Sequence, residues 1–292
     1  MKVAIYGRTV DKEFESYVKE FLSILKQHNI DFIIEKRFFD FLINEMKFNF
    51  NSIKTFETHE DIKNSIDLII SIGGDGTILE TINLVRDANI PIVGINTGRL
   101  GFLANIAKEE IRSAVEAIIE KKYKIDERVL LKINTESNIF SDFPYGLNEV
   151  AIQKKDSTMI TVHAFINDEF LNTYWADGLI ISTPTGSTAY SLSSGGPIII
   201  PHSGNFIVTP ISAHNLTVRP IVIPDSSVIK LKVESRSNNY LISFDHRSII
   251  MDNSEDIIIS KAEFKIKLLK LNTTDYYSTL RTKLMWGIDK RN

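Results

Sequence analysis

The segment with the clearest potential for chemistry runs from Asp67 to Thr77, where a short apolar stretch ends in three glycines around one carboxylate. A helix is predicted to follow at once, because apolar residues recur there at helical spacing, at Ile78, Leu79, Ile82 and Val85. A strand, a tight turn and a helix N-terminus together form the backbone geometry of an anion-binding site. The glycines would let a ligand come close to the main chain.

Asp75 is the unexpected residue in this turn, because a carboxylate repels a bound phosphate unless it has a separate task. It is therefore a candidate general base, metal ligand or partner of a substrate hydroxyl. The alternative is an ordinary strand–helix turn in which Asp75 caps the helix. This segment by itself favours neither interpretation.

A second unusual segment, Thr183–Gly196, contains seven Ser or Thr residues and three glycines in fourteen positions. Hydroxyl groups can cap a turn, and they can also form hydrogen bonds with a polar ligand. A Ser-rich turn is the simpler explanation for such a segment in isolation. The density of hydroxyls and the glycines that interrupt them favour a ligand-binding loop.

Three shorter groups are weaker candidates. Asn148 and Glu149 lie in an apolar strand, where neighbouring side chains point to opposite faces, so a polar pair at a strand edge explains them equally well. Asp177 begins an Asp-Gly pair, which is typical of a turn. His246 and Arg247 lie in an expected turn and are candidates for contact with a phosphate or substrate, with a solvated turn as the alternative.

The composition is that of a soluble globular protein, with 43% hydrophobic and 24% charged residues. A formal net charge of −3 argues against a broad nucleic-acid-binding surface. The absence of cysteine excludes disulfides, thiol catalysis and cysteine-bound metals, and it fits a reducing compartment. We see no signal peptide and no apolar run near the about 18 residues of a membrane span, so we expect a cytoplasmic protein without a membrane partner.

Two domains are expected from the change in periodicity along the chain. Residues 1–124 alternate between buried strands, such as 68–72 and 92–95, and amphipathic helices, which predicts an α/β domain with a parallel sheet that carries the Gly-Gly-Asp-Gly-Thr loop. Residues 125–275 contain many short strands separated by turns, which predicts an all-β sandwich. The expected strands are 129–134, 146–153, 159–166, 179–182, 206–211, 228–233, 240–244, 256–260 and 264–269. A helix at 276–292 is expected to end the chain and to pack back on the first domain.

Taken together, these segments resemble the NAD kinase family, in its bacterial form. The matching pieces are Gly73–Thr77, Asn96–Leu103, Asn148-Glu149, Asp177-Gly178, Thr183–Tyr190, Ser212–His214 and Arg219–Val222. The Gly-Gly-Asp-Gly motif alone is shared with phosphofructokinases and lipid kinases. The segment Thr183–Tyr190 and the pair Asn148-Glu149 narrow the resemblance to NAD kinase.

The resemblance implies a phosphofructokinase-like α/β domain and a C-terminal β-sandwich, with NAD bound between them. Asp75 would be the base near the 2′-hydroxyl of the adenosine ribose. Asp177 would contact the nicotinamide from a neighbouring subunit, so a homo-oligomer, either dimer or tetramer, with a shared active site is expected. The residues implied in NAD binding are Asp75, Gly76, Asn148, Glu149, Asp177, Thr185, Thr188, Ala189, Tyr190, Ser191, Leu192 and Ser193.

The sequence departs from the family pattern in two places. Asp245-His246-Arg247 stands where many relatives carry Asp-Gly-Gln, which puts the contacts of that turn in doubt. Trp175 stands where some bacterial relatives have an arginine, so contacts with a neighbouring subunit are expected to differ.

The function expected on this basis is ATP-dependent phosphorylation of NAD to NADP, with NAD and ATP as ligands and Mg²⁺ as the metal. The protein ligands of the metal remain unassigned. A lipid kinase with the same glycine-rich loop and a non-catalytic dinucleotide sensor are the alternatives. The sequence does not decide between ATP and polyphosphate as donor, between NAD and NADH, or whether NADPH inhibits.

Overall fold

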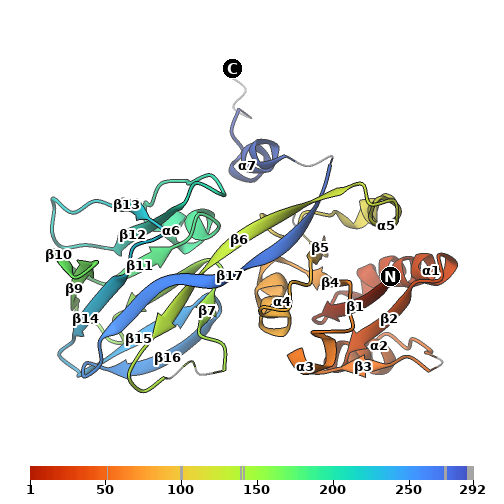
Figure 1. Cartoon of the computed structure of the whole chain (residues 1–292), viewed down its shortest axis with the longest axis horizontal. Helices are drawn as coiled ribbons and strands as arrows, with labels where there is room; N and C mark the ends of the chain where they lie inside the picture. The colour runs from red at the N-terminus through yellow and green to blue at the C-terminus, as the bar shows by residue number, and fades with distance from the viewer. Residues whose placement is uncertain (51, 99–100, 139, 141, 273–274, 288–292) are drawn as a thin grey trace. The chain divides into compact units, whose positions relative to one another are not determined.

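The computed structural model of this chain describes residues 1–50, 52–98, 101–138, 140, 142–272 and 275–287 (Figure 1). The chain divides into two compact units. Unit 1 contains Met1–Glu127 and Ile266–Asn292, and unit 2 contains Arg128–Lys265. The sequence-based ranges placed the divisions at 124 and 275 instead. Two long strands, β6 (Tyr123–Asn134) and β17 (Ile257–Leu271), include the points where the chain passes from one unit to the other.

Unit 1 is built on a parallel sheet with the order β3-β2-β1-β4-β5. Its strands are β1 (Lys2–Gly7), β2 (Asp31–Glu35), β3 (Thr55–Phe56), β4 (Leu68–Gly73) and β5 (Ile92–Asn96). Every residue of β4 and β5 is buried, which explains their continuous apolar sequences. The carboxyl ends of these strands share one edge of the sheet, and the glycine-rich turn lies at that edge. This confirms the predicted parallel α/β architecture.

The helices of unit 1 cover both faces of this sheet. Val93 and Ile95 belong to a core with α1 (Glu15–Gln27), α2 (Lys36–Asn44) and α5 (Ile111–Ile119). Gly94, between them, faces Ile78 of α4 (Asp75–Val85), because successive residues of a strand point to opposite faces. The other helices of this unit are α3 (His59–Ile62) and α7 (Tyr276–Leu284). No helix within the described ranges has the length and hydropathy of a membrane span.

Unit 2 is a sandwich of two antiparallel sheets. One sheet has the order β13-β12-β11-β8-β15-β16. In the other, β10-β9-β14-β17 are neighbours, β6 pairs with β17, and β7 pairs with β6. Buried residues from both sheets form one core, which confirms the predicted all-β sandwich. Two short helical segments, η3 (Gly186–Thr188) and α6 (Tyr190–Ser193), follow β11. The strands are β7 (Tyr145–Gly146), β8 (Glu149–Gln153), β9 (Ile160–Ile166), β10 (Glu169–Ala176), β11 (Gly178–Ser182), β12 (Asn205–Ile211), β13 (Ile221–Pro224), β14 (Ile229–Glu234), β15 (Asn239–Phe244) and β16 (Arg247–Asp252).

In unit 2 the sequence-based strand assignment differs from the structure in three respects. It omitted β10, β13 and β16, it joined β7 and β8 in one strand at 146–153, and it divided β17 into separate strands at 256–260 and 264–269. All three omitted strands lie at sheet edges. Few of their residues are buried, so they lack a strong alternation of apolar and polar residues.

Gly94 provides a test of the packing between β5 and α4. A Cβ atom at this position would lie 2.5 Å from Ile78 Cδ1 and 2.7 Å from the main-chain Cα of Ala104. Because the main chain cannot move aside as a flexible side chain can, we expect Gly94→Ala to lower the free energy of unfolding by about 1–3 kcal/mol. Urea unfolding followed by circular dichroism would measure this loss.

The matched control is Gly98→Ala, because a Cβ atom there would meet no heavy atom within 4 Å. We expect this variant to stay within about 0.5 kcal/mol of the parent protein. Equal stability of the two variants would contradict the packing described here.

Candidate functional site

The glycine-rich turn joins β4 to α4, and its glycines fall into two groups. Gly73 has a φ of +155°, and a Cβ there would collide with the side chain of Thr77. By contrast, a Cβ on Gly74 or Gly76 would meet no heavy atom within 4 Å. The fold therefore requires glycine at position 73, whereas the bare main chain at 74 and 76 leaves room for a ligand at the N-terminus of α4.

Asp75 is held by the loop that follows β5. Its Oδ2 accepts a hydrogen bond from Phe102 N at 2.8 Å, and its Oδ1 accepts from Leu103 N at 3.0 Å and Ala104 N at 2.9 Å. Gly101 must be glycine here, because a Cβ would collide with the carboxylate. Asp75 does not cap its own helix, since the N-cap residue is Gly74. Arg99 and Leu100, part of the 96–103 motif, lie outside the described residues.

These contacts define which part of the Asp75 carboxylate remains available. A carboxylate has about four acceptor positions, two on each oxygen. Oδ1 accepts two of the hydrogen bonds from the loop and Oδ2 accepts one. Oδ2 is therefore the oxygen with a lone pair for a substrate hydroxyl or a metal ion.

In unit 2, Asp245 holds the turn that presents Asn148 and Glu149. Its carboxylate accepts hydrogen bonds from Leu147 N at 2.8 Å, Asn148 N at 2.7 Å and Glu149 N at 3.2 Å. Strand β8 begins only at Glu149, so Asn148 lies in the bend before it. The two side chains are thus not restricted to opposite faces of a regular strand. The sequence analysis missed this role of Asp245, which it described only as part of a turn.

Glu149 is a buried carboxyl group, 8% exposed, whose Oε2 has no hydrogen-bond partner among the described residues. Burial and the nearby carboxylate of Asp245 raise the pKa of Glu149 to about 8, against a smaller opposing effect of the Tyr190 amide. Burial also raises the pKa of Asp245, but three backbone amides and Arg247 favour its charged form. We therefore place the proton of this pair on Glu149 and the negative charge on Asp245.

The Ser- and Thr-rich segment packs directly against this turn. Thr183 Oγ1 donates to Leu147 O at 2.6 Å, and Thr183 N donates to Asn148 O at 2.9 Å. Arg128 Nη1 donates to Thr185 Oγ1 at 2.9 Å. The structure therefore brings Asn148 and Glu149 together with the segment that begins at Thr183, as the sequence analysis expected of residues in one site.

The hydroxyls of this segment divide into structural and accessible groups. Ser191 is fully buried and its Oγ lies 2.9 Å from Thr209 Oγ1, so its hydroxyl is used inside unit 2. Tyr190 OH accepts a hydrogen bond from Gln153 Nε2 at 2.7 Å. The residues of this segment that keep side-chain exposure are Thr188, Ala189, Tyr190, Leu192 and Ser193. These are the positions from which a ligand contact is sterically possible.

Asp177 lies at the other end of β11 from this cluster. Gly178 pairs with Gln153 whereas Ser182 pairs with Glu149, so Asp177 and Thr183 flank opposite ends of the strand. Five strand residues span about 16 Å. The carboxylate of Asp177 forms an ion pair with Lys154, with Oδ1 and Nζ 2.7 Å apart. Its contact with a neighbouring subunit stays a prediction.

Arg247 has a clear structural function. Its Nη1 donates to Phe143 O at 2.7 Å and its Nη2 donates to Tyr145 O at 2.6 Å. The guanidinium also lies 5.5 Å from the ring centroid of Phe143 and 5.8 Å from that of Phe244. Phosphate contact by Arg247 and by the exposed His246 stays a prediction, and the geometry favours a structural role for the arginine.

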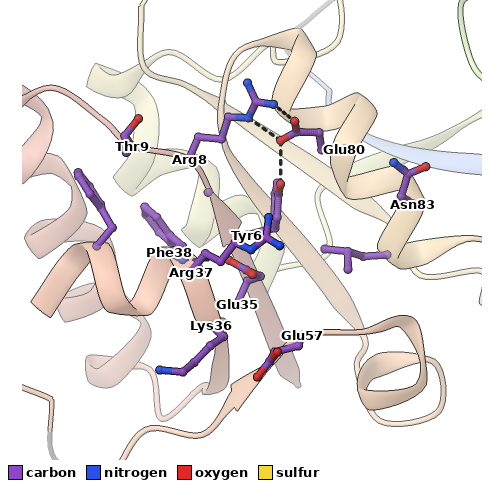
Figure 2. Close-up of a pocket in the computed structure, with 13 residues that line it drawn as sticks. Tyr6, Arg8, Thr9, Glu35, Lys36, Arg37, Phe38, Glu57, Glu80 and Asn83 are labelled. Carbon is purple, nitrogen blue, oxygen red and sulfur yellow. Dashed lines mark hydrogen bonds and ion pairs between the residues drawn. The ribbon is translucent and has the colours of Figure 1, made fainter. Parts of the chain in front are cut away.

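The sequence analysis missed a cavity of about 610 Å³ in unit 1, at the carboxyl ends of β1 and β2 (Figure 2). Glu80 of α4 binds two residues of β1 and its following loop there. Tyr6 OH donates to Glu80 Oε2 at 2.8 Å, and Arg8 Nε donates to the same oxygen at 2.6 Å. The only sequence signal was a charged residue, Arg8, directly after the first strand.

Models of known protein families match most of the chain. Residues 3–123 match the ATP-NAD kinase N-terminal domain, and residues 147–271 match the ATP-NAD kinase C-terminal domain. Three similar proteins named NAD kinase come from Cytophaga hutchinsonii, Flavobacterium psychrophilum and Bacteroides fragilis, and they are 47%, 45% and 43% identical to this chain. Each alignment covers 100% of both proteins.

Two solved structures share the fold. The yeast NADH kinase complexed with NADH superposes with a TM-score of 0.85 at 24% identity, and the match covers 98% of this chain and 88% of the yeast chain. An NAD kinase from Archaeoglobus fulgidus in complex with ATP superposes with a TM-score of 0.76 at 26% identity, and the match covers 98% and 99%. Both confirm the predicted combination of an α/β unit and a β unit.

The contact between Asp75 and the 101–104 loop can be tested by hydrogen exchange. In Asp75→Asn the amide nitrogen that replaces one oxygen cannot accept a hydrogen bond, so part of the loop loses its anchor. We expect the amides of 102–104 to exchange about tenfold faster, which corresponds to about 1.4 kcal/mol. Asp87→Asn, at an exposed position after the same helix, is the control and should leave this exchange unchanged. Unchanged exchange in Asp75→Asn would show that the carboxylate does not fix the loop.

The raised pKa of Glu149 predicts a pH dependence of stability. Between its ordinary pKa of 4.5 and its folded pKa of about 8, the folded protein holds a proton that the unfolded chain releases. The contribution of this group is therefore complete below pH 4.5 and is lost as the pH rises toward 8. Glu149→Gln cannot ionise, so we expect its melting temperature relative to the parent to increase from pH 5 to pH 8.5.

Glu169→Gln is the matched control for this comparison, because Glu169 is exposed at the start of β10. Its melting temperature should follow that of the parent at both pH values. A constant difference between Glu149→Gln and the parent across the pH range would contradict the protonated state assigned to Glu149.

Proposed function

This chain belongs to the ATP-NAD kinase family, and from that premise we propose that it transfers the terminal phosphoryl group of ATP to the 2′-hydroxyl of the adenosine ribose of NAD, which gives NADP. The family match over both parts of the chain carries this proposal. The glycine-rich turn supports it, because a carboxylate is fixed beside a main chain that is open to a ligand.

Asp75 acts in this proposal as the general base. A ribose hydroxyl is a weak nucleophile at neutral pH, so a positioned carboxylate that accepts its proton accelerates the transfer. The three loop amides orient Asp75 while leaving a lone pair on Oδ2 for the hydroxyl. The role therefore depends on orientation by the 102–104 loop as much as on the acidity of the group.

The N-terminus of α4 is the proposed binding position for the transferred phosphate. The open positions at Gly74 and Gly76 let phosphate oxygens approach the first amides of the helix, and the helix dipole favours negative charge there. A magnesium ion held by the donor phosphates would neutralise their charge. No group of three or more His, Asp or Glu side chains in the described part of the chain forms a ready metal site.

The turn at Asn148 and the loop at 183–193 are the proposed contacts of the dinucleotide. Protonated Glu149 has an unpartnered Oε2, so it is suited to form a hydrogen bond with a ribose oxygen or a ring nitrogen. Thr188, Ala189, Tyr190 and Ser193 offer accessible groups beside it. We further propose a cytoplasmic homo-oligomer, dimer or tetramer, in which Asp177 contacts the nicotinamide bound by a neighbouring subunit.

Formation of NADP from NAD and ATP by the purified protein tests this proposal directly. We expect Asp75→Asn to lower kcat by about 10² to 10⁴-fold, the usual contribution of a general base. Its dissociation constant for NAD, measured by calorimetry, should remain within a few-fold of the parent value.

The Asp87→Asn variant serves as the control here, because Asp87 is exposed and lies beyond the helix that carries Asp75. It should retain full activity. No NADP from the parent protein would refute the proposed reaction, and near-normal turnover by Asp75→Asn would refute the assignment of the base.

A further inference from the structure

The cavity beside β1 and β2 lies outside every residue assigned to the site so far. Its walls come from the end of β1, the end of β2 and the beginning of α2, and the middle of α4 (Figure 2). Its volume of about 610 Å³ lies within the range of small-molecule sites, about 300–1,000 Å³. All of its lining residues belong to unit 1.

The cavity is close to the glycine-rich turn. Gly7 at the end of β1 pairs with Ile72 of β4, so Arg8 follows beside Gly73 at the same edge of the sheet. Along α4, Glu80 is five residues after Asp75, a rise of about 7.5 Å. A ligand with its phosphates at the turn would therefore extend its other end into the cavity. In open parallel α/β sheets, ligands bind at the carboxyl ends of the strands, at the point where the strand order reverses. In this sheet that point lies between β1 and β4.

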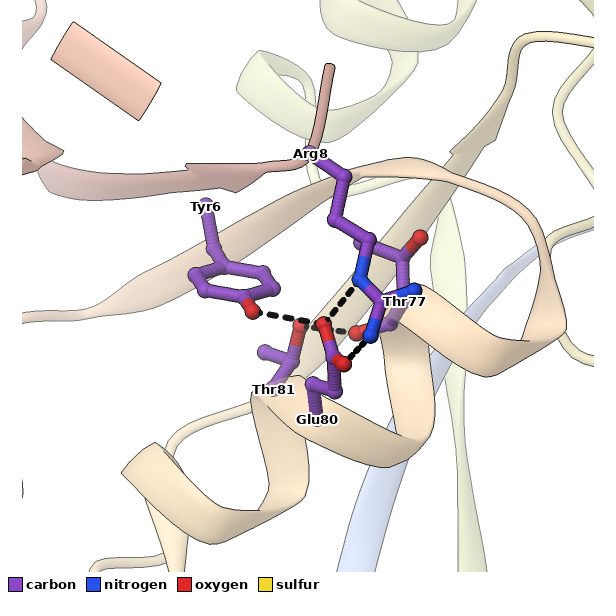
Figure 3. A network of polar contacts seen from close by, with 5 residues as sticks. All are labelled: Tyr6, Arg8, Thr77, Glu80 and Thr81. Atoms are coloured by element: carbon purple, nitrogen blue, oxygen red, sulfur yellow. Dashed lines mark hydrogen bonds and ion pairs between the residues drawn. The ribbon is translucent and has the colours of Figure 1, made fainter. Parts of the chain in front are cut away.

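A cation is held at the mouth of this cavity. Arg8 forms an ion pair with Glu80 through Nη2 and a hydrogen bond through Nε, while Tyr6 OH donates to the same carboxylate (Figure 3). The Arg8 side chain is 61% exposed, whereas the Glu80 side chain is 16% exposed. Glu80 thus fixes the guanidinium while its remaining N–H groups stay accessible, and an arginine in this state is suited to bind phosphate oxygens.

Glu80 is itself fixed by the helix that carries it. On the adjacent residue of the helix, Thr81 Oγ1 donates to Thr77 O at 2.8 Å (Figure 3). The same hydroxyl oxygen lies 3.0 Å from Ser71 Oγ, which joins α4 to β4. The turn, the helix and the cation are therefore linked by contacts within unit 1.

The other walls of the cavity carry both signs of charge and an apolar surface. Glu35 and Glu57 add carboxylates, Lys36 and Arg37 add cations, and Phe38, Phe41 and Leu84 add apolar surface. With Arg8 and Glu80 the lining holds three cations and three carboxylates, so it offers no net positive charge to a chain of phosphates, whereas its apolar and aromatic groups can contact a nucleoside. The Asn83 amide can donate and accept hydrogen bonds at the edge of a base, and the carboxylates can accept them.

We propose that this cavity binds the nucleoside of the phosphoryl donor, with Arg8 on the donor phosphates and Glu80 as the residue that positions Arg8. The enzyme then uses a nucleoside triphosphate in preference to inorganic polyphosphate. This inference rests on the proposed kinase function and adds a donor subsite to it.

Substitution of Arg8 tests the subsite. We expect Arg8→Gln to raise the KM for ATP by about tenfold, equivalent to about 1.4 kcal/mol, and to leave the KM for NAD within about twofold. The matched control is Arg112→Gln, because Arg112 is also exposed and ion-paired with a glutamate, Glu20, but lies on α5 outside the cavity. An unchanged KM for ATP, or an equal rise in the KM for NAD, would overturn the proposal.

The positioning role of Glu80 has its own readout. Glu80→Gln should raise the KM for ATP, and adding it to Arg8→Gln should cause no further rise, because Glu80 acts through Arg8. Independent, additive effects would show that Glu80 does not act through the arginine.

Asn83→Tyr fills the cavity without a change of charge and should also weaken binding of a non-hydrolysable ATP analogue. Normal binding by this variant would overturn the subsite.

Donor choice provides the final test. The parent protein should show a kcat/KM for ATP at least about tenfold above that for inorganic polyphosphate of defined length, and comparable values would overturn the inference. Calorimetry with the ATP analogue separates the two proposals. Absence of NADP formation refutes the kinase function, whereas normal analogue binding by Arg8→Gln in a protein that does form NADP refutes the subsite alone.

Discussion

Each unit of this protein depends on one carboxylate that accepts three hydrogen bonds from the main chain of a loop. Asp75 binds the amides of 102–104 in unit 1, and Asp245 binds those of 147–149 in unit 2. Loop amides that would otherwise lack partners are satisfied, and the loop is fixed at the carboxylate. Hydrogen bonds of this kind to an ionised group are stronger than neutral ones, so three of them to one carboxylate can hold a loop in place.

The two carboxylates serve different ends. Asp245 is partly buried. Burial of Glu149, together with the nearby Asp245 carboxylate, raises the pKa of Glu149, which creates a neutral acid in the part of unit 2 that faces the Ser- and Thr-rich loop. Asp75 retains an accessible lone pair beside two glycines that leave the main chain open. The same interaction therefore supplies a donor in one unit and an acceptor in the other.

Features that depend on neighbouring residues could be predicted from the sequence, whereas features that depend on distant residues could not. Buried parallel strands and the glycine-rich turn are local, and β4, α4 and β5 were predicted within a few residues. The edge strands β10, β13 and β16 were missed because one face and one edge of each lack partners, which weakens the apolar alternation. The loop contacts of Asp75 and Asp245 were missed because their partners are 27 to 29 and 96 to 98 residues away, and no local pattern marks them.

Charge explains why single cations matter in this chain. A protein with a net charge of −3 has no general attraction for nucleotides, so anion binding depends on helix N-termini and on individual arginines. Arg247 is not suited to that task, because two of its nitrogens hold carbonyl groups of the 143–145 segment. Arg8 differs because its ion-pair partner is the carboxylate of Glu80, which fixes the guanidinium while the arginine side chain stays 61% exposed. The position of each arginine's partner therefore decides whether it stabilises the fold or remains available to a ligand.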